Sequence, residues 1–464
     1  MRRFLGVLIL ALSSTLAAQA DKVDRLVHST ILSLHFPGVS LAVVHHGRLV
    51  KAKGYGLANF ETQSAATSKT VYEIGSMTKQ FTAVAVMMLV EEGRLGLEDP
   101  LTRYFPDAPD WWARITIRHV LTHTSGIQNH VAVPGYLSAF KSTLFFEDTP
   151  SRDELLHMFY RLPKEFEPGE TWAYDNTGYY LLGIILEKVS GQGYYDLLEN
   201  RIFRPLSMTA TRRTDARPVV PGRAAGYEWV RDHWENRRSL PPAVGFAAGA
   251  ILSTVEDLAR WDQALRSQTL LKRSRLEQMW TPATANEGRR AAFDYGFGWF
   301  VESYAGRRDI HHGGGTPGFS SSMHRFVGDD LTVILLTNYG DRILDHLALE
   351  IAGIYEPRLR ARLRSGADPQ LTAQHRRILA DLVEERSDLV RFTEPMRLHL
   401  GTATGKGFLK WYAAHGDLNS FTPLVIGNTE EPGTFRYGVG LGAGVYRFSF
   451  KLTEDGQIAQ IHPW

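Results

Sequence analysis

Three features of the sequence predict an α/β (α+β) fold in which helices flank an antiparallel sheet. A β-hairpin pattern at residues 39–53 comes first, and a long, mainly helical stretch follows at residues 75–205. Strand patterns return after residue 290, so the sheet would take strands from both ends of one unit, with a helical domain inserted between them. Short, Gly-rich strand patterns after residue 396 indicate a further, small β-rich domain.

Residues 1–20 have the pattern of a cleavable secretory signal peptide. Arg2 and Arg3 precede a short apolar run from Phe4 to Leu12, and Ala18-Gln-Ala20 fits the rule of small residues at a cleavage site. The run is too short to cross a bilayer, and no later segment has the required length. We therefore expect a periplasmic or secreted protein with no integral membrane segment; an uncleaved signal anchor is the alternative.

The composition excludes several kinds of site and partner. The 464 residues include no cysteine, which excludes disulfides, thiolate metal ligands and a cysteine nucleophile. The formal charge is +2, and cleavage after residue 20 would remove two arginines and no acid, which brings the charge near zero. Such a balance does not indicate a nucleic-acid partner. We expect a small-molecule or peptide substrate, no cofactor and no metal; the oligomeric state stays open.

The chain after the signal peptide begins with an amphipathic helix and the hairpin. In residues 22–36 the apolar side chains have helical spacing and would form one face: Val23, Leu26, Val27, Ile31 and Leu34. Pro37-Gly38 ends this helix. The predicted hairpin has strands at Val39–Val44 and Arg48–Lys53.

The segment Glu73-Ile-Gly-Ser-Met-Thr-Lys79 opens the helical stretch. An apolar run, Phe81–Val90, follows and ends near Gly93, which indicates a buried helix with a glycine C-cap. Ser76 would be its N-cap or lie in its first turn, with Lys79 three residues later on the same face. A lysine can take the proton of a serine hydroxyl when burial lowers its pKa. Serine is also a common N-cap, so this motif alone is weak.

Tyr174-Asp-Asn176 is the second motif, in a loop before an apolar helix at Tyr179–Val189. Alternate residues of an extended loop point the same way, so Tyr174 and Asn176 would face one pocket. A tyrosine can relay a proton to a leaving group, and the Asn176 amide can hold a substrate carbonyl and bond to Lys79. The alternative is that both residues only cap the next helix.

The remaining helical patterns surround a loop. Residues 128–150 show no period and are expected to form an ordered loop or lid near the cleft. Helices are expected at Ile115–Thr122, after the capping box Ser151–Glu154, and at Tyr194–Asn200.

The next part of the chain returns to strands. A hairpin within Glu228–Trp234 and an apolar segment at Gly245–Leu252 come first, and the capping box Ser253–Glu256 opens a helix through Leu265. Strands are then expected at Tyr295–Val301, Arg308–His312, Ser320–Val327 and Leu331–Asn338, and a closing helix at Asp341–Ile354.

His312-Gly-Gly-Gly315 is the third motif and follows one of these strands. Glycines there would let a ligand backbone approach the strand edge, and a free N–H can complete an oxyanion hole. His312 and Gly314 are therefore candidate substrate-binding residues; a glycine turn with an incidental histidine is the alternative. A metal at His311-His312 is not expected, because adjacent strand residues point to opposite faces.

The chain beyond residue 357 is predicted to contain a basic linker at residues 358–372 and the small β-rich domain at residues 373–464. A helix at Gln370–Glu385 leads into it, and its strands include Phe435–Val439 and Val445–Lys451. Residues 21–357 would then form the first, larger domain.

Taken in order, Ser76-x-x-Lys79, Tyr174-x-Asn176 and His312-x-Gly314 resemble the motifs of the penicillin-recognising serine hydrolases, the serine β-lactamase and transpeptidase-like group. The class C β-lactamase-like branch, with esterases, D-aminopeptidases and D,D-carboxypeptidases, is the most similar. The likeness covers about residues 25–355, and four further phrases agree with it: Leu121–Gly126, Phe166–Gly169, Asn176–Tyr179 and Gly315–Ser320.

The resemblance implies a helical domain packed on an antiparallel sheet, with the cleft between them. It implies Ser76 as the acylated nucleophile, Lys79 and Tyr174 as residues that share general base and acid work, and Asn176 as a substrate-binding residue. The backbone N–H groups of Ser76 and Gly315 would form the oxyanion hole.

Two positions depart from the pattern of this family. Asp175 stands where small residues are common, and the alternation of the loop predicts that its side chain points away from Lys79. His312 stands where many relatives have lysine, which is usual among the esterase and peptidase relatives and favours them over β-lactamases. The C-terminal domain loosely resembles the lipocalin-like or small β-barrel appendages that some of these hydrolases carry.

The favoured hypothesis is an exported serine hydrolase that forms an acyl-enzyme with an ester or amide: small esters, D-amino-acid peptides of the cell-wall type, or β-lactams. The alternative is a penicillin-binding or regulatory protein on the same scaffold that turns over weakly. Residues 128–150 and 207–245 are expected to shape the pocket and so to decide the substrate.

Overall fold

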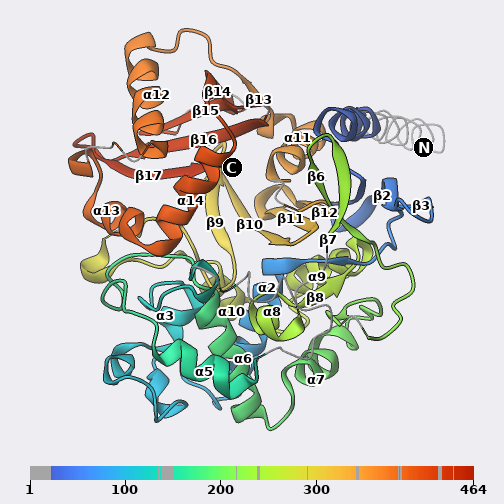
Figure 1. Ribbon diagram of the computed structural model, residues 1–464, viewed down its shortest axis with the longest axis vertical. Helices are drawn as coiled ribbons and strands as arrows, with labels where there is room; N and C mark the ends of the chain where they lie inside the picture. The colour runs from blue at the N-terminus through green and yellow to red at the C-terminus, as the bar shows by residue number, and fades with distance from the viewer. Residues whose placement is uncertain are drawn as a thin grey trace, which may run out of the picture.

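The computed structural model describes residues 22–463 except for residues 134–135, 137–149, 216, 238–240, 290, 341–343, 385, 387–388, 427–430 and 443. The predicted signal peptide and most of the predicted loop at 128–150 lie outside the described residues. Figure 1 shows a central sheet, a mainly helical region below it, and a C-terminal unit at the upper left. The term C-terminal unit is used below for residues 361–463.

A seven-stranded antiparallel sheet has the order β3-β2-β1-β12-β11-β10-β9. Its strands are β1 (Gly38–His45), β2 (Arg48–Asn59), β3 (Ser64–Ala65), β9 (Phe300–Tyr304), β10 (Arg307–Thr316), β11 (Phe319–Phe326) and β12 (Leu331–Thr337). Because β1 pairs with both β2 and β12, the N-terminal hairpin and the late strands share one sheet. The predicted fold class is confirmed.

Both faces of the central strands are buried, each against different elements. In β12, Ile334 and Leu336 point to one face, here called the cleft face, which packs on α9 (Val255–Ser267). Val333 and Leu335 point to the other, the far face, which is covered by α11 (Asp345–Tyr355) and the helix over residues 22–34. Burial on both faces explains why these strands are continuous apolar runs in the sequence.

The helical region is built around α2, which is buried along nearly its whole length. Its helices are α2 (Thr78–Glu91), α3 (Ile117–Leu121), α5 (Arg152–Tyr160), α6 (Asn176–Ser190), α7 (Tyr194–Leu198) and α8 (Pro242–Gly249), with α10 (Arg273–Met279) near the sheet. Both α6 and α8 pack against α2. As predicted, α2 ends just before a glycine, Gly93, with a φ of +72°.

Small strands complete this part of the molecule. β4 (Tyr72–Glu73) and β5 (Arg212–Arg213) both pair with β8 (Ile251–Ser253), which brings the chain before Ser76 next to the end of α8. β6 (Gly226–Val230) and β7 (His233–Arg237) form the predicted hairpin.

Two predicted element boundaries were wrong: the start of one strand and the cap of one helix. The strand predicted at Tyr295–Val301 begins only at Phe300, because the chain before it makes a tight loop in which Gly298 has a φ of +79°. The cap of α9 is Thr254, whose side chain accepts from the Asp257 N–H; Ser253 instead ends β8.

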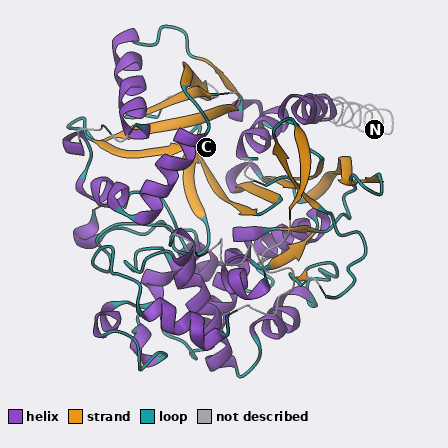
Figure 2. Ribbon diagram, in the orientation of Figure 1, coloured by secondary structure: helices purple, strands orange, loops and turns teal. Residues whose placement is uncertain are grey.

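The C-terminal unit contains a five-stranded antiparallel sheet, as predicted, and more helix than predicted (Figure 2). Its elements are β13 (Ala361–Leu363), α12 (Pro369–Val383), α13 (Glu394–Gly401), α14 (Ala403–Ala414), β14 (Leu418–Ile426), β15 (Thr434–Leu441), β16 (Gly444–Leu452) and β17 (Ile458–Pro463). Residues 396–414 were expected to belong to a region of short, Gly-rich strands, but Thr402 accepts from the Gly405 N–H and caps a helix there. Among the described helices, none has both the length and the apolar character that a membrane crossing requires.

Candidate active site

Ser76 lies in a single 3-10 turn, Gly75–Met77, directly before α2. This places it at the entrance of the helix, as expected, but its side chain does not cap the helix. The Ser76 Oγ instead lies 3.2 Å from the Lys79 Nζ, one turn further along. The hydroxyl is therefore available to a base and is not used by the backbone.

Lys79 has no exposed surface. Its Nζ donates to the Asn176 Oδ1 at 2.7 Å and to the Ala248 carbonyl at 2.8 Å, in addition to the contact with Ser76. Burial lowers the pKa of Lys79 well below its ordinary value, and the Asp175 carboxylate opposes this shift. A neutral amine has two N–H groups for the two carbonyl acceptors, which leaves its lone pair for the Ser76 hydroxyl proton.

Tyr174 lies on the other side of Lys79, with its ring centre 4.7 Å from the Nζ. Burial raises the pKa of Tyr174, and the Ser76 hydroxyl is the group that opposes the rise. Asn176, two residues later, begins α6, and its Nδ2 donates to the Asn129 Oδ1 at 3.2 Å. Tyr174 and Asn176 both point toward Lys79, as expected. The expected contact between Asn176 and Lys79 is the hydrogen bond given above.

Asp175 points away from the cleft, as the alternation of the loop predicted. Its carboxylate caps α6 by accepting from the N–H groups of Thr177 at 2.7 Å and Gly178 at 3.0 Å. Burial raises the pKa of Asp175 to about 7, although these two N–H groups oppose the rise. The departure from small residues at this position thus has a helix-capping explanation.

The glycines of the third motif lie inside β10 and allow it to touch the turn that carries Ser76. A Cβ on Gly314 would lie 2.1 Å from the Ile74 carbonyl oxygen and 2.8 Å from the Ser76 nitrogen. A Cβ on Gly75, whose φ is +51°, would lie 2.8 Å from the Gly315 nitrogen. Only glycine permits this close contact between β10 and the turn. The contact places the main-chain nitrogens of Ser76 and Gly315 on the two sides of the boundary between the turn and the strand, near each other. Gly315 itself is exposed.

His312 is 2% exposed and points to the cleft face of the sheet. Its Nδ1 donates to the Gly313 carbonyl at 2.5 Å, since a carbonyl can only accept, and its Nε2 accepts from the Tyr295 hydroxyl at 3.0 Å. Burial, and next the Lys79 amine, lower the pKa of His312 to about 3. His312 is therefore a neutral side chain whose two nitrogens already have partners in the protein.

Two contributors were not identified as site residues from the sequence. His123 packs its ring 4.4 Å from that of Tyr174 and accepts from the Asp175 N–H at 3.1 Å. Its only signal was its place in the phrase Leu121–Gly126. Ala248 acts through its carbonyl, and a carbonyl carries no signal in the sequence because every residue has one. Phe246, two residues before it, has a φ of +37°, which bends α8 toward Lys79.

The far face of β10 carries a different group of histidines. The His311 and His324 rings stack at 4.7 Å across the strand pair. His324 donates to Asp309 at 2.7 Å and lies 3.2 Å from Asp345 of α11. Within the described residues, no group of three or more His, Asp or Glu side chains could hold a metal ion.

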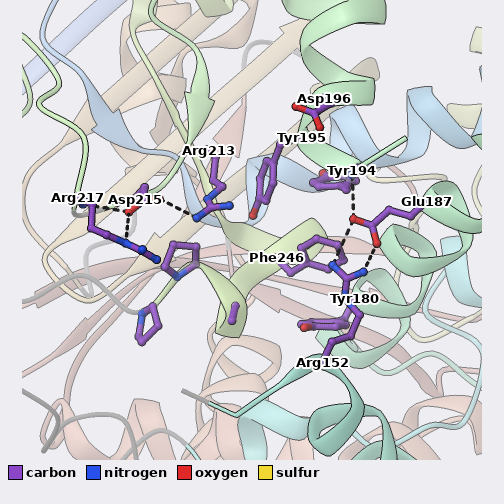
Figure 3. A pocket seen from close by; sticks show the side chains of 14 residues that line it. Arg152, Tyr180, Glu187, Tyr194, Tyr195, Asp196, Arg213, Asp215, Arg217 and Phe246 are labelled. Atoms are coloured by element: carbon purple, nitrogen blue, oxygen red, sulfur yellow. Dashed lines mark hydrogen bonds and ion pairs between the residues drawn. The ribbon is translucent and has the colours of Figure 1, made fainter. Parts of the chain in front are cut away.

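A pocket beside α8 lies partly in the region expected to decide the substrate (Figure 3). Aromatic side chains and three arginines line it, and Figure 3 shows Arg152 beside Glu187 and Arg213 beside Asp215. Arg217 also lies 3.9 Å from Asp215. The lining also includes three acidic residues, Glu187, Asp196 and Asp215, so this pocket has no excess of positive charge.

Known proteins are similar to this chain in sequence and in fold. The family model described as Beta-lactamase matches residues 19–352. Penicillin-binding protein 4* of Bacillus subtilis (strain 168) is 32% identical over 319 residues, which are 65% of this chain and 68% of that protein. The D-stereospecific amidohydrolase from Streptomyces sp. is 28% identical, with a TM-score of 0.55 over 68% of this chain and 93% of that one.

One solved structure also includes the C-terminal unit. The octameric penicillin-binding protein homologue from Pyrococcus abyssi is 22% identical, with a TM-score of 0.65 over 94% of this chain and 97% of that chain. This likeness shows that the two folds agree. By its family match and its relative in Bacillus subtilis, the chain belongs to the Beta-lactamase family and has the fold of its penicillin-binding serine hydrolases.

Proposed function

We propose that the protein is a serine hydrolase that forms an acyl-enzyme at Ser76 and cleaves esters or amides of D-amino acids, as in peptides of the cell-wall type. The observation that carries this proposal is Lys79. It is fully buried, lies 3.2 Å from the Ser76 hydroxyl, and has two carbonyl acceptors that a neutral amine satisfies. A buried lysine with such partners has the properties of a general base.

Acylation would proceed as follows. The Ser76 Oγ attacks the substrate carbonyl carbon while its proton passes to the Lys79 Nζ. The N–H groups of Ser76 and Gly315 stabilise the oxyanion of the tetrahedral intermediate. When that intermediate collapses, the bond to the leaving group breaks, and the leaving nitrogen or oxygen takes a proton from the Tyr174 hydroxyl, which recovers it from Lys79.

Deacylation would use the same groups in the reverse direction. Water attacks the Ser76 ester and loses a proton to the neutral Lys79 amine; the Ser76 Oγ leaves with a proton from Tyr174, which recovers it from Lys79. Asn176 is proposed to hold both the Lys79 amine and the substrate carbonyl. His312 and Gly314 are proposed to line the substrate side of the cleft, where the His312 side chain is uncharged.

Two observations support the substrate class. A neutral His312 adds no positive charge that would hold a free substrate carboxylate, which favours esters and amides. The similarity to a penicillin-binding protein and to a D-stereospecific amidohydrolase supports acyl groups of D configuration.

The test combines labelling and turnover. The protein is treated with a fluorophosphonate, and its intact mass and peptide map are measured for wild type, Ser76→Ala and the exposed control Ser267→Ala. We expect one adduct, on Ser76, in wild type and in the control only. Absence of an adduct on wild type would overturn the proposed function.

Turnover then tests the substrate class. D- and L-alanine p-nitroanilides, p-nitrophenyl acetate and nitrocefin are compared at equal concentration. We expect the D-anilide to exceed the L-anilide by about tenfold or more in kcat/KM, which is about 1.4 kcal/mol of transition-state discrimination. Equal rates for both configurations would refute the D-specific part alone.

We also propose that residues 1–20 direct export and are then removed. N-terminal sequencing of protein from the periplasm or medium of an expressing bacterium is expected to start at Asp21. Recovery of only full-length protein from the cytoplasm would contradict this.

A further inference from the structure

The loop segment that carries Tyr174 is held between two parts of the molecule. Along one edge, the N–H groups of Ala173 and Asp175 donate to the carbonyl and the Nδ1 of His123, at 3.0 and 3.1 Å. Along the other edge, the carbonyls of Trp172 and Tyr174 accept hydrogen bonds. The segment thus resembles the middle strand of a sheet, with alternate residues bonded to opposite sides.

The donors on the second edge belong to the C-terminal unit. His399 of α13 donates from its Nδ1 to the Trp172 carbonyl at 2.9 Å, and Thr404 of α14 donates from its hydroxyl to the Tyr174 carbonyl at 2.9 Å. The Thr171 hydroxyl in turn donates to the Pro395 carbonyl at 2.6 Å. Figure 1 shows α13 and α14 on the side of the C-terminal unit that faces the helical region.

Apolar packing joins the same two surfaces. Trp172 shares one hydrophobic cluster with Phe293 and Tyr295 and with the interior of the C-terminal unit. The His399 ring lies 5.5 Å from that of Trp172 and 5.0 Å from that of Phe293. The contact is therefore a continuous buried core, which fixes the two parts against each other.

Tyr174 needs support of this kind because its reactive end is free. Its hydroxyl is buried, and no described residue other than Ser76 approaches it as a hydrogen-bond partner. A hydroxyl that must give and regain a proton cannot be held by strong fixed bonds at that end. Its position then depends on its main chain and on the rings beside it.

We propose that Thr404 and His399 are positioning residues for Tyr174, so that the C-terminal unit forms part of the catalytic machinery of this protein. The inference rests on the role proposed above for Tyr174. Thr404 is the better test position, because it is partly exposed and, among the described residues, its hydroxyl donates one hydrogen bond, to the Tyr174 carbonyl.

The experiment uses the full chain with Thr404→Val, the conservative Thr404→Ser, and the matched control Thr372→Val, whose hydroxyl bonds to the Asp368 carbonyl and to Tyr437, both within the C-terminal unit. Thr404→Ala is the second variant if Thr404→Val does not fold. Each protein is labelled with 3-fluorotyrosine, and the resonance of Tyr174 is assigned by its loss in Tyr174→Phe. Hydrolysis of the D-alanine anilide is measured in parallel.

We expect the Tyr174 resonance to shift or broaden in Thr404→Val, and kcat to fall about 5- to 10-fold with KM within about twofold, the size of one lost hydrogen bond. Thr404→Ser and Thr372→Val should match wild type in both measurements. An unchanged resonance in Thr404→Val, or a changed resonance with unchanged kcat, would overturn the inference. A changed resonance in a protein whose wild type hydrolyses nothing would support the positioning contact and refute the proposed function.

Discussion

His312 and His324 lie on opposite faces of the same strand pair and are buried equally, at 2% exposure each. On the cleft face, the pKa of His312 is lowered to about 3, with burial as the main cause. On the far face, burial alone would lower the pKa of His324, but the Asp309 charge and the hydrogen bonds to Asp309 and Asp345 raise it to about 10. One imidazole is neutral and the other is a cation.

The difference shows that burial does not by itself decide the charge of a histidine; the neighbouring carboxylates do. The far face has two carboxylates in contact with His324, and they form a buried charge network that stabilises the fold. Among the described residues, no carboxylate forms a hydrogen bond or ion pair with His312. The Asp175 carboxyl, next to Tyr174, points away from the cleft and caps α6.

The largest expected effect lies on the cleft face. Lys79→Met keeps the length of the side chain and removes the amine, so acylation of Ser76 should slow by about 10²- to 10⁴-fold, the range of a lost general base. Stopped-flow or mass-resolved labelling measures this, with exposed Lys272→Ala as the control. Unchanged acylation by a correctly folded Lys79→Met would show that the cleft face does not carry the chemistry.

The matching change on the far face should affect stability instead. Asp309→Asn leaves His324 with one carboxylate, and breaking a buried ion pair costs about 3 kcal/mol of unfolding free energy. Urea unfolding measures it, with the exposed Asp107→Asn as control. Acylation by the folded fraction should stay within about twofold of wild type. A large loss of acylation without a loss of stability would reverse the division of roles between the faces.

The two histidines should also give opposite pH dependence of stability. The folded pKa of His324 is raised, so its contribution is complete below pH 6.5, declines as the pH rises toward about 10, and is lost above. The folded pKa of His312 is lowered, so its contribution is present above pH 6.5 and is lost as the pH falls toward about 3. His324→Gln should flatten the alkaline side of the stability curve, and His312→Asn the acid side.

Urea unfolding at several pH values between 4 and 10 checks this pair. Each variant should differ from wild type by about one proton in the slope on its own side only. Identical slopes on both sides would mean that the two faces do not differ in charge.

The smallest effects come from the loss of single hydrogen-bond donors. Tyr295→Phe removes the donor to His312, and Ser322→Ala removes a donor to Asp345 at 2.6 Å. The unfolding free energy should fall by about 1 kcal/mol in Tyr295→Phe and by about 2 kcal/mol in Ser322→Ala, whose acceptor is a carboxylate. Only Tyr295→Phe should change kcat/KM, by a few fold, because of the two residues only Tyr295 contacts the cleft face. Equal changes of kcat/KM in both variants would contradict the assignment of catalysis to the cleft face.

The sequence predicted what is local. The spacing of Ser76 and Lys79 within one helix turn, and the alternation that directs Asn176 to Lys79 and Asp175 away from it, depend on backbone geometry alone. The fold class followed from the order of hairpin, helices and late strands, together with a family resemblance.

The rest depends on tertiary contacts that no local pattern encodes. The Ala248 carbonyl reaches Lys79 because Phe246 adopts a positive φ, which is unusual for a bulky residue. Helices α13 and α14 were not predicted because their glycines disfavour a helix. Thr402 nevertheless caps α14, and Thr404 of α14 bonds to the Tyr174 carbonyl. Packing there outweighs helix propensity.

The most direct test of the central claim, that a neutral Lys79 activates Ser76, is the pH dependence of Ser76 acylation by a fluorophosphonate. Burial lowers the pKa of Lys79 well below its ordinary value, so the amine should lose its proton well below pH 10.5. We predict that the acylation rate rises with pH and reaches its plateau far below pH 10.5, and that Lys79→Met has neither the rise nor the plateau. A rate that keeps rising up to about pH 10.5, or a profile that Lys79→Met shares, would contradict it.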